Sequence, residues 1–326
     1  MGGNTVRIGL LGASRISVGA IIEPARVFDD AVVHAVAARD PARAKVFAEQ
    51  HGIRRVYDDY ASLIESPEID LVYNGLPPAG HKSWTILALK AGKSVLCEKP
   101  FAMNSAEAEA MVVAASDTGN HLIEAFHYRF HPFFERVLEI VESGELGDIV
   151  EAHAHFNVPI AYTPTELRFR PELGGGALMD LGVYPLHWLR TLFSGNPTVS
   201  RAHSVTNDTG VDVTTNGVLV FRNGLEATFS TSMDTALPDI LDAGIRLLGS
   251  KGEMQADNPL APQVGNRLTV TGASKPWIFE GESTYYYQLQ HTLAVLRGDA
   301  EPLTGGQDAI DTMRLVDEVK RVASIK

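Results

Sequence analysis

Strand-like and helix-like segments alternate along the first 125 residues, and this alternation constrains the fold more than any other feature. Short apolar runs rich in Val, Ile and Leu predict strands, and longer segments with helical patterning separate them. The predicted strands are residues 6–11, 32–38, 69–76, 94–97 and 121–125, and the predicted helices between them include residues 41–51, 81–91 and 105–118. Such alternation is typical of a doubly wound parallel sheet.

The first predicted strand ends in a glycine turn that leads into a helix, which is the context of a dinucleotide-binding fingerprint. Gly12 would allow the tight turn. Serines stand where the fingerprint usually has its second and third glycines, so the motif alone is weak. The backbone N–H groups expected to face a pyrophosphate are those of Ala13, Ser14, Arg15 and Ile16.

Arg39 follows the second predicted strand, about 20 residues beyond the fingerprint. NAD-binding proteins place an acidic residue there, whereas NADP-binding proteins place an arginine near the 2′-phosphate. The sequence therefore favours NADP, with NAD still possible. Asp40 fits better as the N-cap of the next helix, with Pro41 at its first position. The alternative, that Arg39 is a surface arginine in a turn, stays open.

The segment Ser94–Pro100 is an apolar strand that ends in a carboxylate, an amine and a proline. Open α/β sheets bind ligands at the carboxyl ends of their strands, so Lys99 is a candidate catalytic residue. The alternative is that Glu98 and Lys99 are solvated residues at a strand end. Further candidate cofactor contacts at this edge are Pro77, His81, Glu98 and Lys99 itself.

Beyond residue 125 the strands are rich in Val, Thr and Ser, and hairpin signals appear, such as Asn223-Gly224. The sequence predicts two domains, residues 1–125 and residues 126–326. The first is a Rossmann-type doubly wound parallel sheet. The second is an α+β domain with a large, mostly antiparallel open sheet, closed by helices near residues 285–296 and 307–323.

A glycine-rich helix in the second domain carries three titratable groups. Asp180, Tyr184 and His187 fall at i, i+4 and i+7, so a helix beginning near Gly176 would place them on one face. Pro185 would remove a helical hydrogen bond and kink the helix just after Tyr184. The preceding glycines would let the backbone approach the cofactor or the other domain closely. The alternative is an amphipathic helix whose Asp and Tyr face water.

These residues resemble the Gfo/Idh/MocA oxidoreductases over nearly the whole chain, and most closely the dimeric dihydrodiol dehydrogenase and glucose–fructose oxidoreductase branch. That resemblance implies a catalytic pair, Lys99 and Tyr184, supported by Asp180, and a cis Lys99–Pro100 bond. It also implies a homodimer or homotetramer. His187 is either a further substrate contact or an ordinary helix residue. The motifs that carry the resemblance are the Gly12 turn, Val36–Asp40, Glu98-Lys99-Pro100, Glu124–Phe126, Arg129–Pro132 and Gly174–Tyr184.

The implied reaction is hydride transfer between a nicotinamide and the hydroxyl- or carbonyl-bearing carbon of a sugar, polyol or cyclic diol. A tyrosine with a pKa near 10 needs a neighbouring ammonium to act as a base at neutral pH, and Lys99 would supply it. Two other functions stay open. One is an NAD-dependent glycosidase of the same fold, and the other is a non-catalytic dinucleotide sensor.

The composition of the chain limits the kinds of partner that it can bind. The net charge of −12 and the pI of about 5.4 argue against nucleic acid, because phosphate binding requires a basic surface. Two histidine pairs, His153 with His155 and His127 with His131, lack the further ligands of a zinc site, so no metal is expected. No basic and apolar leader or membrane-spanning run is evident, so we expect a cytoplasmic enzyme with a small-molecule substrate and no membrane partner.

Overall fold

The computed structural model describes residues 5–238 and 240–325. Contacts between Cα positions group the chain into two compact units. The first consists of Met1–Arg129 and Tyr285–Ile310, and the second of Phe130–Thr284 and Asp311–Lys326. This grouping differs from the predicted division after residue 125, which gave all later residues to the second domain.

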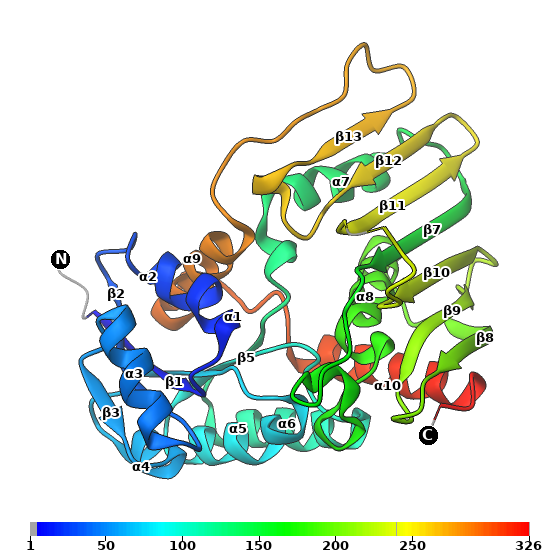
Figure 1. Cartoon of the computed structure of the whole chain (residues 1–326). Coiled ribbons are helices and arrows are strands. Elements are labelled where there is room, and N and C mark those ends of the chain that lie inside the picture. Colours follow the sequence, from blue (N-terminus) through cyan, green and yellow to red (C-terminus); the bar gives the residue numbers. More distant parts are fainter. Residues whose placement is uncertain (1–4, 239, 326) are drawn as a thin grey trace. The chain divides into compact units, whose positions relative to one another are not determined.

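The first unit is built on a six-stranded parallel sheet with the strand order β3-β2-β1-β4-β5-β6 (Figure 1). The strand order reverses between β1 and β4, and ligands of such sheets bind outside the carboxyl ends of the strands at this point. The predicted doubly wound sheet is confirmed, but the short edge strand β3 was not predicted. The strands are β1 (Val6–Leu11), β2 (Ala31–Ala37), β3 (Arg55–Tyr57), β4 (Leu71–Asn74), β5 (Ser94–Cys97) and β6 (Leu122–Glu124).

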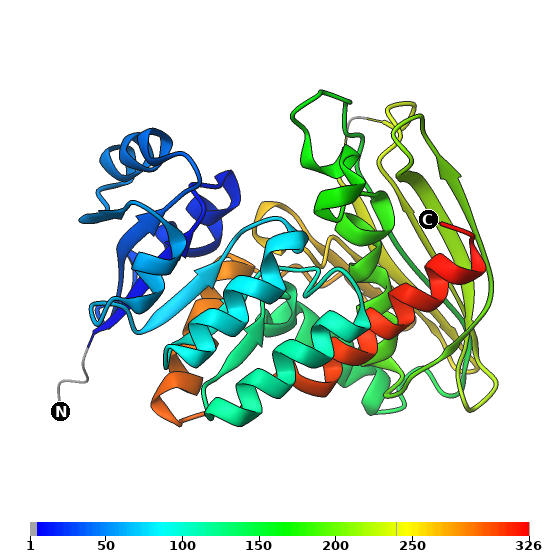
Figure 2. The same cartoon turned by 90° about the horizontal axis from the view of Figure 1, so that it is seen from below.

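Local sequence signals fix the helices of this unit. The carboxylate of Asp40 accepts a hydrogen bond from the N–H of Ala42 at 3.0 Å, which confirms the predicted cap of α3. Helices α5 and α6 run side by side (Figures 1 and 2). The helices are α1 (Arg15–Ser17), a π-helical segment (Val18–Ile22), α2 (Glu23–Ala25), α3 (Pro41–His51), α4 (Tyr60–Glu65), α5 (His81–Lys90) and α6 (Ser105–Thr118).

Helix α9 (Thr284–Arg297) explains why a late segment returns to the first unit. Its residues Leu289 and Leu293 are buried in the same apolar cluster as Ile8 and Leu10 of β1. A helix was predicted here, but it was assigned to the second domain. Its apolar side instead completes the core of the first unit.

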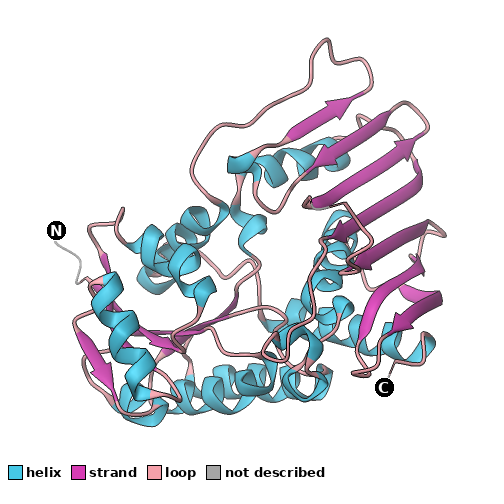
Figure 3. Cartoon of the chain, in the orientation of Figure 1, coloured by secondary structure: helices cyan, strands magenta, loops and turns pink. Residues whose placement is uncertain are grey.

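The second unit contains a seven-stranded sheet with the order β13-β12-β11-β7-β10-β9-β8. Its strands are labelled in Figure 1 and drawn in magenta in Figure 3. All neighbouring strands are antiparallel except β7 and β10, which confirms the mostly antiparallel prediction. The Asn223-Gly224 turn joins β9 to β10, and Gly224 has φ +85°. The strands are β7 (Ile149–Asn157), β8 (Thr198–Thr206), β9 (Asp212–Val220), β10 (Glu226–Ser232), β11 (Asp242–Gly249), β12 (Glu253–Asp257) and β13 (Arg267–Val270).

Helices cover one face of this second sheet. Along β7 the side chains of Ala152, Ala154 and Phe156 are buried, whereas the alternate side chains are partly exposed. A π-helical turn (Leu178–Gly182) and α8 (Val183–Leu192) pack against β7 and β10. The remaining helices are α7 (Pro132–Glu142) and α10 (Gly306–Val322), the last of which begins in the first unit and continues in the second.

Candidate active site

The turn after β1 has the conformation that the fingerprint requires. Gly12 has φ +95°, and its N–H donates to the carbonyl of Ala37 at 2.8 Å. A Cβ at this position would lie 3.2 Å from Leu76, which follows the neighbouring strand β4. A side chain at residue 12 would therefore be both strained and crowded, and only glycine fits this turn.

The two serines that replace fingerprint glycines pair with each other. The hydroxyl oxygens of Ser14 and Ser17 lie 2.5 Å apart, and Ser17 is fully buried. A Cβ on Gly75, just beyond β4, would lie 3.3 Å from both hydroxyls. The departure from the glycine pattern thus builds a hydroxyl pair at the switch point of the sheet.

The residues at this edge fit a dinucleotide. Ala13 is buried beneath the turn, whereas Arg15 and Ile16 at the start of α1 are exposed. The first N–H groups of a helix have no carbonyl partner within the helix, and they attract anions such as a pyrophosphate. A left-handed glycine followed directly by a helix start is the kind of backbone cradle that a pyrophosphate needs.

Two arginines follow β2 beside this turn. Arg39 is exposed, and its N–H donates to the Tyr60 hydroxyl at 3.2 Å. The guanidinium of Arg43 donates to the carbonyl of Ala13 at 2.8 Å. Arg43 was not among the predicted cofactor contacts, and no local signal in the sequence marks its bond to Ala13. The structure therefore brings a second cation to the glycine turn.

His81 is a correction to the predicted cofactor contacts. Its ring is 0% exposed, and its Nε2 lies 2.7 Å from the carbonyl oxygen of Leu76. The Nδ1 atom lies 3.0 Å from the carbonyl oxygen of Pro100, and burial lowers the pKa of the imidazole. Both ring nitrogens are engaged by backbone, so His81 holds the turns after β4 and β5. Pro77, at the start of the β4 turn, stays only partly buried.

Lys99 lies directly after β5, on the same edge of the sheet, and its bond to Pro100 is cis as the resemblance implied. The carboxylate of Glu98 is buried and accepts hydrogen bonds from the Tyr73 hydroxyl at 2.7 Å and the Lys99 N–H at 3.3 Å. Burial, together with the Lys99 ammonium, lowers the pKa of His127 to about 3. His127 is therefore neutral near pH 7, and it adds no positive charge beside Lys99.

Asp180, in the second unit, is held by an arginine. Its Oδ2 lies 2.5 Å from the Nε of Arg168, and this carboxylate raises the pKa of the guanidinium. Arg168 also donates to Glu166 at 3.0 Å. An isolated carboxylate next to a guanidinium is favoured in its charged form. Arg168 therefore anchors the Asp180 carboxylate, and sequence analysis did not foresee this partner.

The helix that carries Asp180 and Tyr184 is buried on nearly all sides. Tyr184 is only 4% exposed, and its ring meets Phe156 edge to face and lies beside Trp188. His187 is also buried. The interpretation in which Tyr184 faces water is therefore wrong. Pro185 was expected to kink the helix just after Tyr184, but α8 continues through Pro185, and the irregularity is a π-helical turn before Tyr184. Such turns occur frequently at functional sites.

The glycines before this helix make room for groups of the same unit. A Cβ on Gly175 would lie 2.7 Å from the carbonyl oxygen of Arg168. Gly176 has φ +116°, and its Cβ would lie 2.2 Å from the carboxylate of Asp212. Sequence analysis expected these glycines to approach the cofactor or the other domain. The close approaches are instead to Arg168 and Asp212.

Replacing Gly176 with alanine is expected to lower the free energy of unfolding by roughly 2 kcal/mol or more, because backbone strain and a clash with Asp212 act together. Gly224→Ala is the matched control, since Gly224 has φ +85° with no neighbour within 4 Å of a Cβ. That control is expected to lose about 1 kcal/mol from strain alone. Urea titrations of the two variants measure the difference, and equal losses would contradict the clash.

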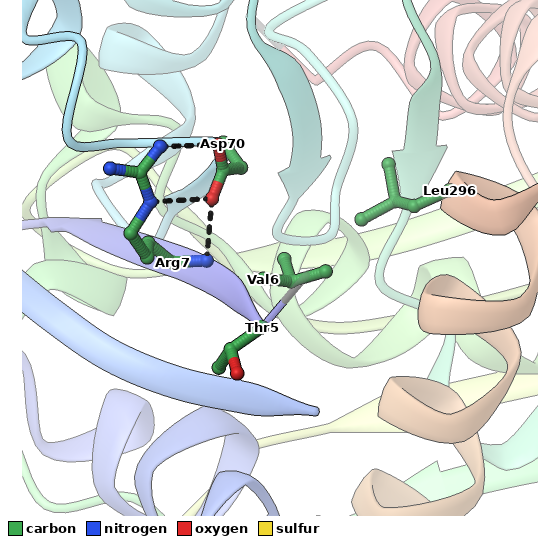
Figure 4. A pocket seen from close by; sticks show the side chains of 5 residues that line it. All are labelled: Thr5, Val6, Arg7, Asp70 and Leu296. Carbon is green, nitrogen blue, oxygen red and sulfur yellow. Dashed lines mark hydrogen bonds and ion pairs between the residues drawn. The ribbon is translucent and has the colours of Figure 1, made fainter. Parts of the chain in front are cut away.

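The hollow drawn in Figure 4 lies at the opposite end of the first sheet from the glycine turn. Arg7, in β1, donates to Asp70 from Nε at 2.9 Å and from Nη2 at 2.8 Å. Asp70 comes just before β4, so the pair joins two strands at their amino ends. Ligands of these sheets bind at the carboxyl ends, and we assign this ion pair to stability.

The histidine pair of β7 lies on one face, as predicted, with stacked rings whose centroids are 5.4 Å apart. His155 pairs with Asp242 at 2.9 Å, and His153 with the Thr228 hydroxyl at 2.8 Å. Among residues 5–238 and 240–325, no group of three or more His, Cys, Asp or Glu side chains is placed to hold a metal ion. The same described residues include no helix long and apolar enough to cross a membrane.

Comparisons with known proteins agree with this geometry. Residues 6–126 match the model of an oxidoreductase family with an NAD-binding Rossmann fold, and residues 134–255 match that of the GFO/IDH/MocA C-terminal domain. Trans-1,2-dihydrobenzene-1,2-diol dehydrogenase of Xenopus laevis is 33% identical over 299 residues, which are 89% of each chain. The D-xylose 1-dehydrogenase (NADP(+)) 2 of Haloferax volcanii is 32% identical over 95% of each chain.

Solved structures show the same likeness over the whole chain. The aldose-aldose oxidoreductase from Caulobacter crescentus, complexed with glycerol, has a TM-score of 0.87 and 27% identity over 98% of both chains. A 3-ketoreductase from Actinomadura kijaniata, in complex with NADP and TDP-benzene, has a TM-score of 0.87 and 26% identity, also over 98% of both chains. The two family models that match this sequence, together with these relatives, show that the chain belongs to the Gfo/Idh/MocA family of NAD(P)-binding oxidoreductases.

Proposed function

We propose that this enzyme uses NADP in preference to NAD and interconverts a hydroxyl and a carbonyl group on a sugar, polyol or cyclic diol. The observation that carries the proposal is that Gly12, Arg39 and Lys99 follow the carboxyl ends of β1, β2 and β5, three parallel strands of the first sheet. The names of the relatives, which refer to aldoses, a xylose and a cyclic diol, support a hydroxylated small molecule as substrate.

We assign the catalytic roles to Lys99, Tyr184 and Asp180. When bound, the nicotinamide supplies the hydride chemistry. The Tyr184 phenolate, stabilised by the Lys99 ammonium, takes up the proton of the substrate hydroxyl during oxidation, and the Tyr184 hydroxyl that results returns this proton during reduction. The Lys99 ammonium stabilises the negative charge that develops on the substrate oxygen. Asp180, which is held in place by Arg168, accepts a hydrogen bond from the substrate, and His187 is a proposed substrate contact.

Two experiments test this proposal. Native mass spectrometry shows whether the purified protein carries a dinucleotide. The protein is then titrated with NADP⁺ and NAD⁺, and the absorbance at 340 nm is followed with a panel of sugars and diols. Exchangeable NADP and reduction of NADP⁺ by one of the substrates would support it. A dinucleotide that stays bound without net reduction would indicate the glycosidase alternative. A dinucleotide that exchanges freely, with no turnover of any substrate, would indicate a sensor. A protein without affinity for either dinucleotide would contradict the proposal altogether.

We also propose that the protein is a homodimer or homotetramer, because an exposed sheet face is a common oligomer surface in the family that the sequence resembles. The outward face of β7 carries partly exposed polar side chains such as His153 and His155. The same native mass spectra give the mass of the assembly. A monomer at micromolar concentration would contradict this part of the proposal.

Arg39 is expected to discriminate between the two cofactors. Arg39→Ala should raise the Kd for NADP⁺ by roughly 10- to 100-fold, since a hydrogen bond to a charged group contributes about 1.5–3 kcal/mol. The Kd for NAD⁺ should change little, because NAD⁺ has no 2′-phosphate. Fluorescence titration measures both constants. Arg54→Ala, another exposed arginine of the first unit, is the control, and an equal effect on both cofactors would contradict the assignment.

A further inference from the structure

Asp212 is a buried carboxylate at the start of β9 that sequence analysis did not single out. It is 3% exposed, and its Oδ2 accepts hydrogen bonds from the Leu178 N–H at 2.8 Å and from the Thr215 hydroxyl at 2.7 Å. Burial raises the pKa of this carboxyl, whereas its two donors lower it. Burying a carboxylate costs free energy of folding, so its presence inside the protein needs a structural or functional reason.

The partner of Asp212 indicates that reason. Helical conformation begins at Ala177, so the Leu178 N–H is one of the first helical N–H groups, which lack partners within the helix. The preceding glycines have no side chain that could cap the helix, unlike the Ser, Thr, Asp or Asn usually found there. Asp212, 34 residues further along the chain, supplies the missing acceptor and a favourable negative charge at the helix N-terminus.

The capped segment carries the proposed catalytic groups. Leu178 opens the π-helical turn that contains Asp180, and Tyr184 lies at the start of α8 immediately after it. The N–H of Asp180 in turn donates to the carbonyl of Gly176 at 3.0 Å. A shift of the helix start would therefore move the side chains of both Asp180 and Tyr184.

We infer that Asp212 is a positioning residue, which caps this helix from β9 and thereby fixes Asp180 and Tyr184 for the reaction. This inference rests on the proposed function. Asp212 itself touches neither substrate nor cofactor in this role. It acts through the Leu178 N–H, with Thr215 fixing the rotamer of the carboxylate and Gly176 leaving the space that the carboxylate occupies.

Kinetics of Asp212→Ala and Asp212→Asn separate geometry from charge. Asp212→Ala is expected to lower kcat on the order of 10²-fold, the effect of a small misplacement of reacting groups. The Kd for the dinucleotide should stay within twofold, because the predicted cofactor contacts belong to the first unit. Asp212→Asn should retain kcat within a few-fold, since an amide oxygen in the place of Oδ2 still accepts from both the Leu178 N–H and the Thr215 hydroxyl. Asp208→Ala, an exposed change in the preceding turn, is the control.

Amide hydrogen exchange of residues 177–184 tests the cap without turnover. Exchange at Leu178 is expected to be at least tenfold faster in Asp212→Ala than in the wild type and nearly unchanged in Asp212→Asn. Wild-type exchange and kcat in Asp212→Ala would overturn the inference, as would an Asn variant as impaired as the Ala variant. If wild-type protein shows no turnover while Leu178 exchange still depends on Asp212, the proposed function fails and the cap stands.

Thr215→Val covers the case in which Asp212→Ala does not fold. It deletes one of the two hydrogen bonds to the carboxylate and keeps the side-chain volume nearly constant. We expect a several-fold fall in kcat and faster exchange at Leu178, because the rotamer of Asp212 is then less fixed. Wild-type values of both quantities in a folded Thr215→Val protein would overturn the inference.

Discussion

Lys99→Met is expected to lower kcat by about 10³-fold while the protein stays folded. Methionine keeps the length and the apolar stem of the lysine and removes only the ammonium. The loss combines the electrostatic stabilisation of the developing oxyanion with the activation of Tyr184, and each such contribution is typically 10²-fold or more. Steady-state kinetics at saturating cofactor, alongside a thermal melt, measure the effect.

The surroundings of Lys99 make the ammonium hard to replace. The residue before Lys99 is the buried Glu98, and the carboxylate of Glu98 accepts a hydrogen bond from the Tyr73 hydroxyl. His127 is held neutral by burial and by the charge of Lys99, because its pKa falls to about 3. Neutral His127 is therefore unable to stabilise an oxyanion as a cation would near pH 7.

Lys90→Met provides the matched control for Lys99→Met. Lys90 is exposed in the last turn of α5, so the same chemical change there should leave kcat and stability nearly unchanged. The Kd for the dinucleotide separates the two roles predicted for Lys99, cofactor contact and catalysis. A folded Lys99→Met protein with kcat within tenfold of the wild type would remove Lys99 from the catalytic machinery.

Sequence patterns predicted most of the first sheet because its signals are local. Helix α3 begins after the Asp40 cap and ends at Gly52, which has φ +74°, and both bounds match the prediction. Helix α6 behaves in the same way between Asn104, which caps it, and Gly119. The strand β3 was missed because it is short and mostly exposed, so it shows no apolar run.

The details of the candidate site depend on contacts between distant residues, which no local pattern encodes. Helix α9 was expected in the second domain, although its leucines complete the core of the first unit. The glycines before Asp180 were assigned to a ligand or domain contact, whereas a side chain at Gly175 would meet the backbone of Arg168 and one at Gly176 would meet the carboxylate of Asp212. His81 begins α5 just after the β4 turn, a place that suggests a cofactor contact, yet its ring nitrogens lie against the backbone carbonyls of Leu76 and Pro100.

Tyr184→Phe is expected to lower kcat by 10²- to 10⁴-fold, the usual contribution of a general acid–base group. The change deletes one hydroxyl and keeps the aromatic ring. The contacts of that ring with Phe156 and Trp188 persist, so the free energy of unfolding should change by less than about 1 kcal/mol. Tyr162→Phe, at an exposed tyrosine of the second unit, is the control and should leave kcat unchanged.

The double variant Lys99→Met/Tyr184→Phe decides whether the two residues act as one unit. If Lys99 serves mainly to activate the Tyr184 hydroxyl, its ammonium has little left to do once that hydroxyl is gone. The double variant should then be only slightly slower than the slower single variant, as for other catalytic groups that work together. Multiplicative losses in kcat would mean that Lys99 and Tyr184 contribute independently, and the activation of Tyr184 by the Lys99 ammonium would have to be abandoned.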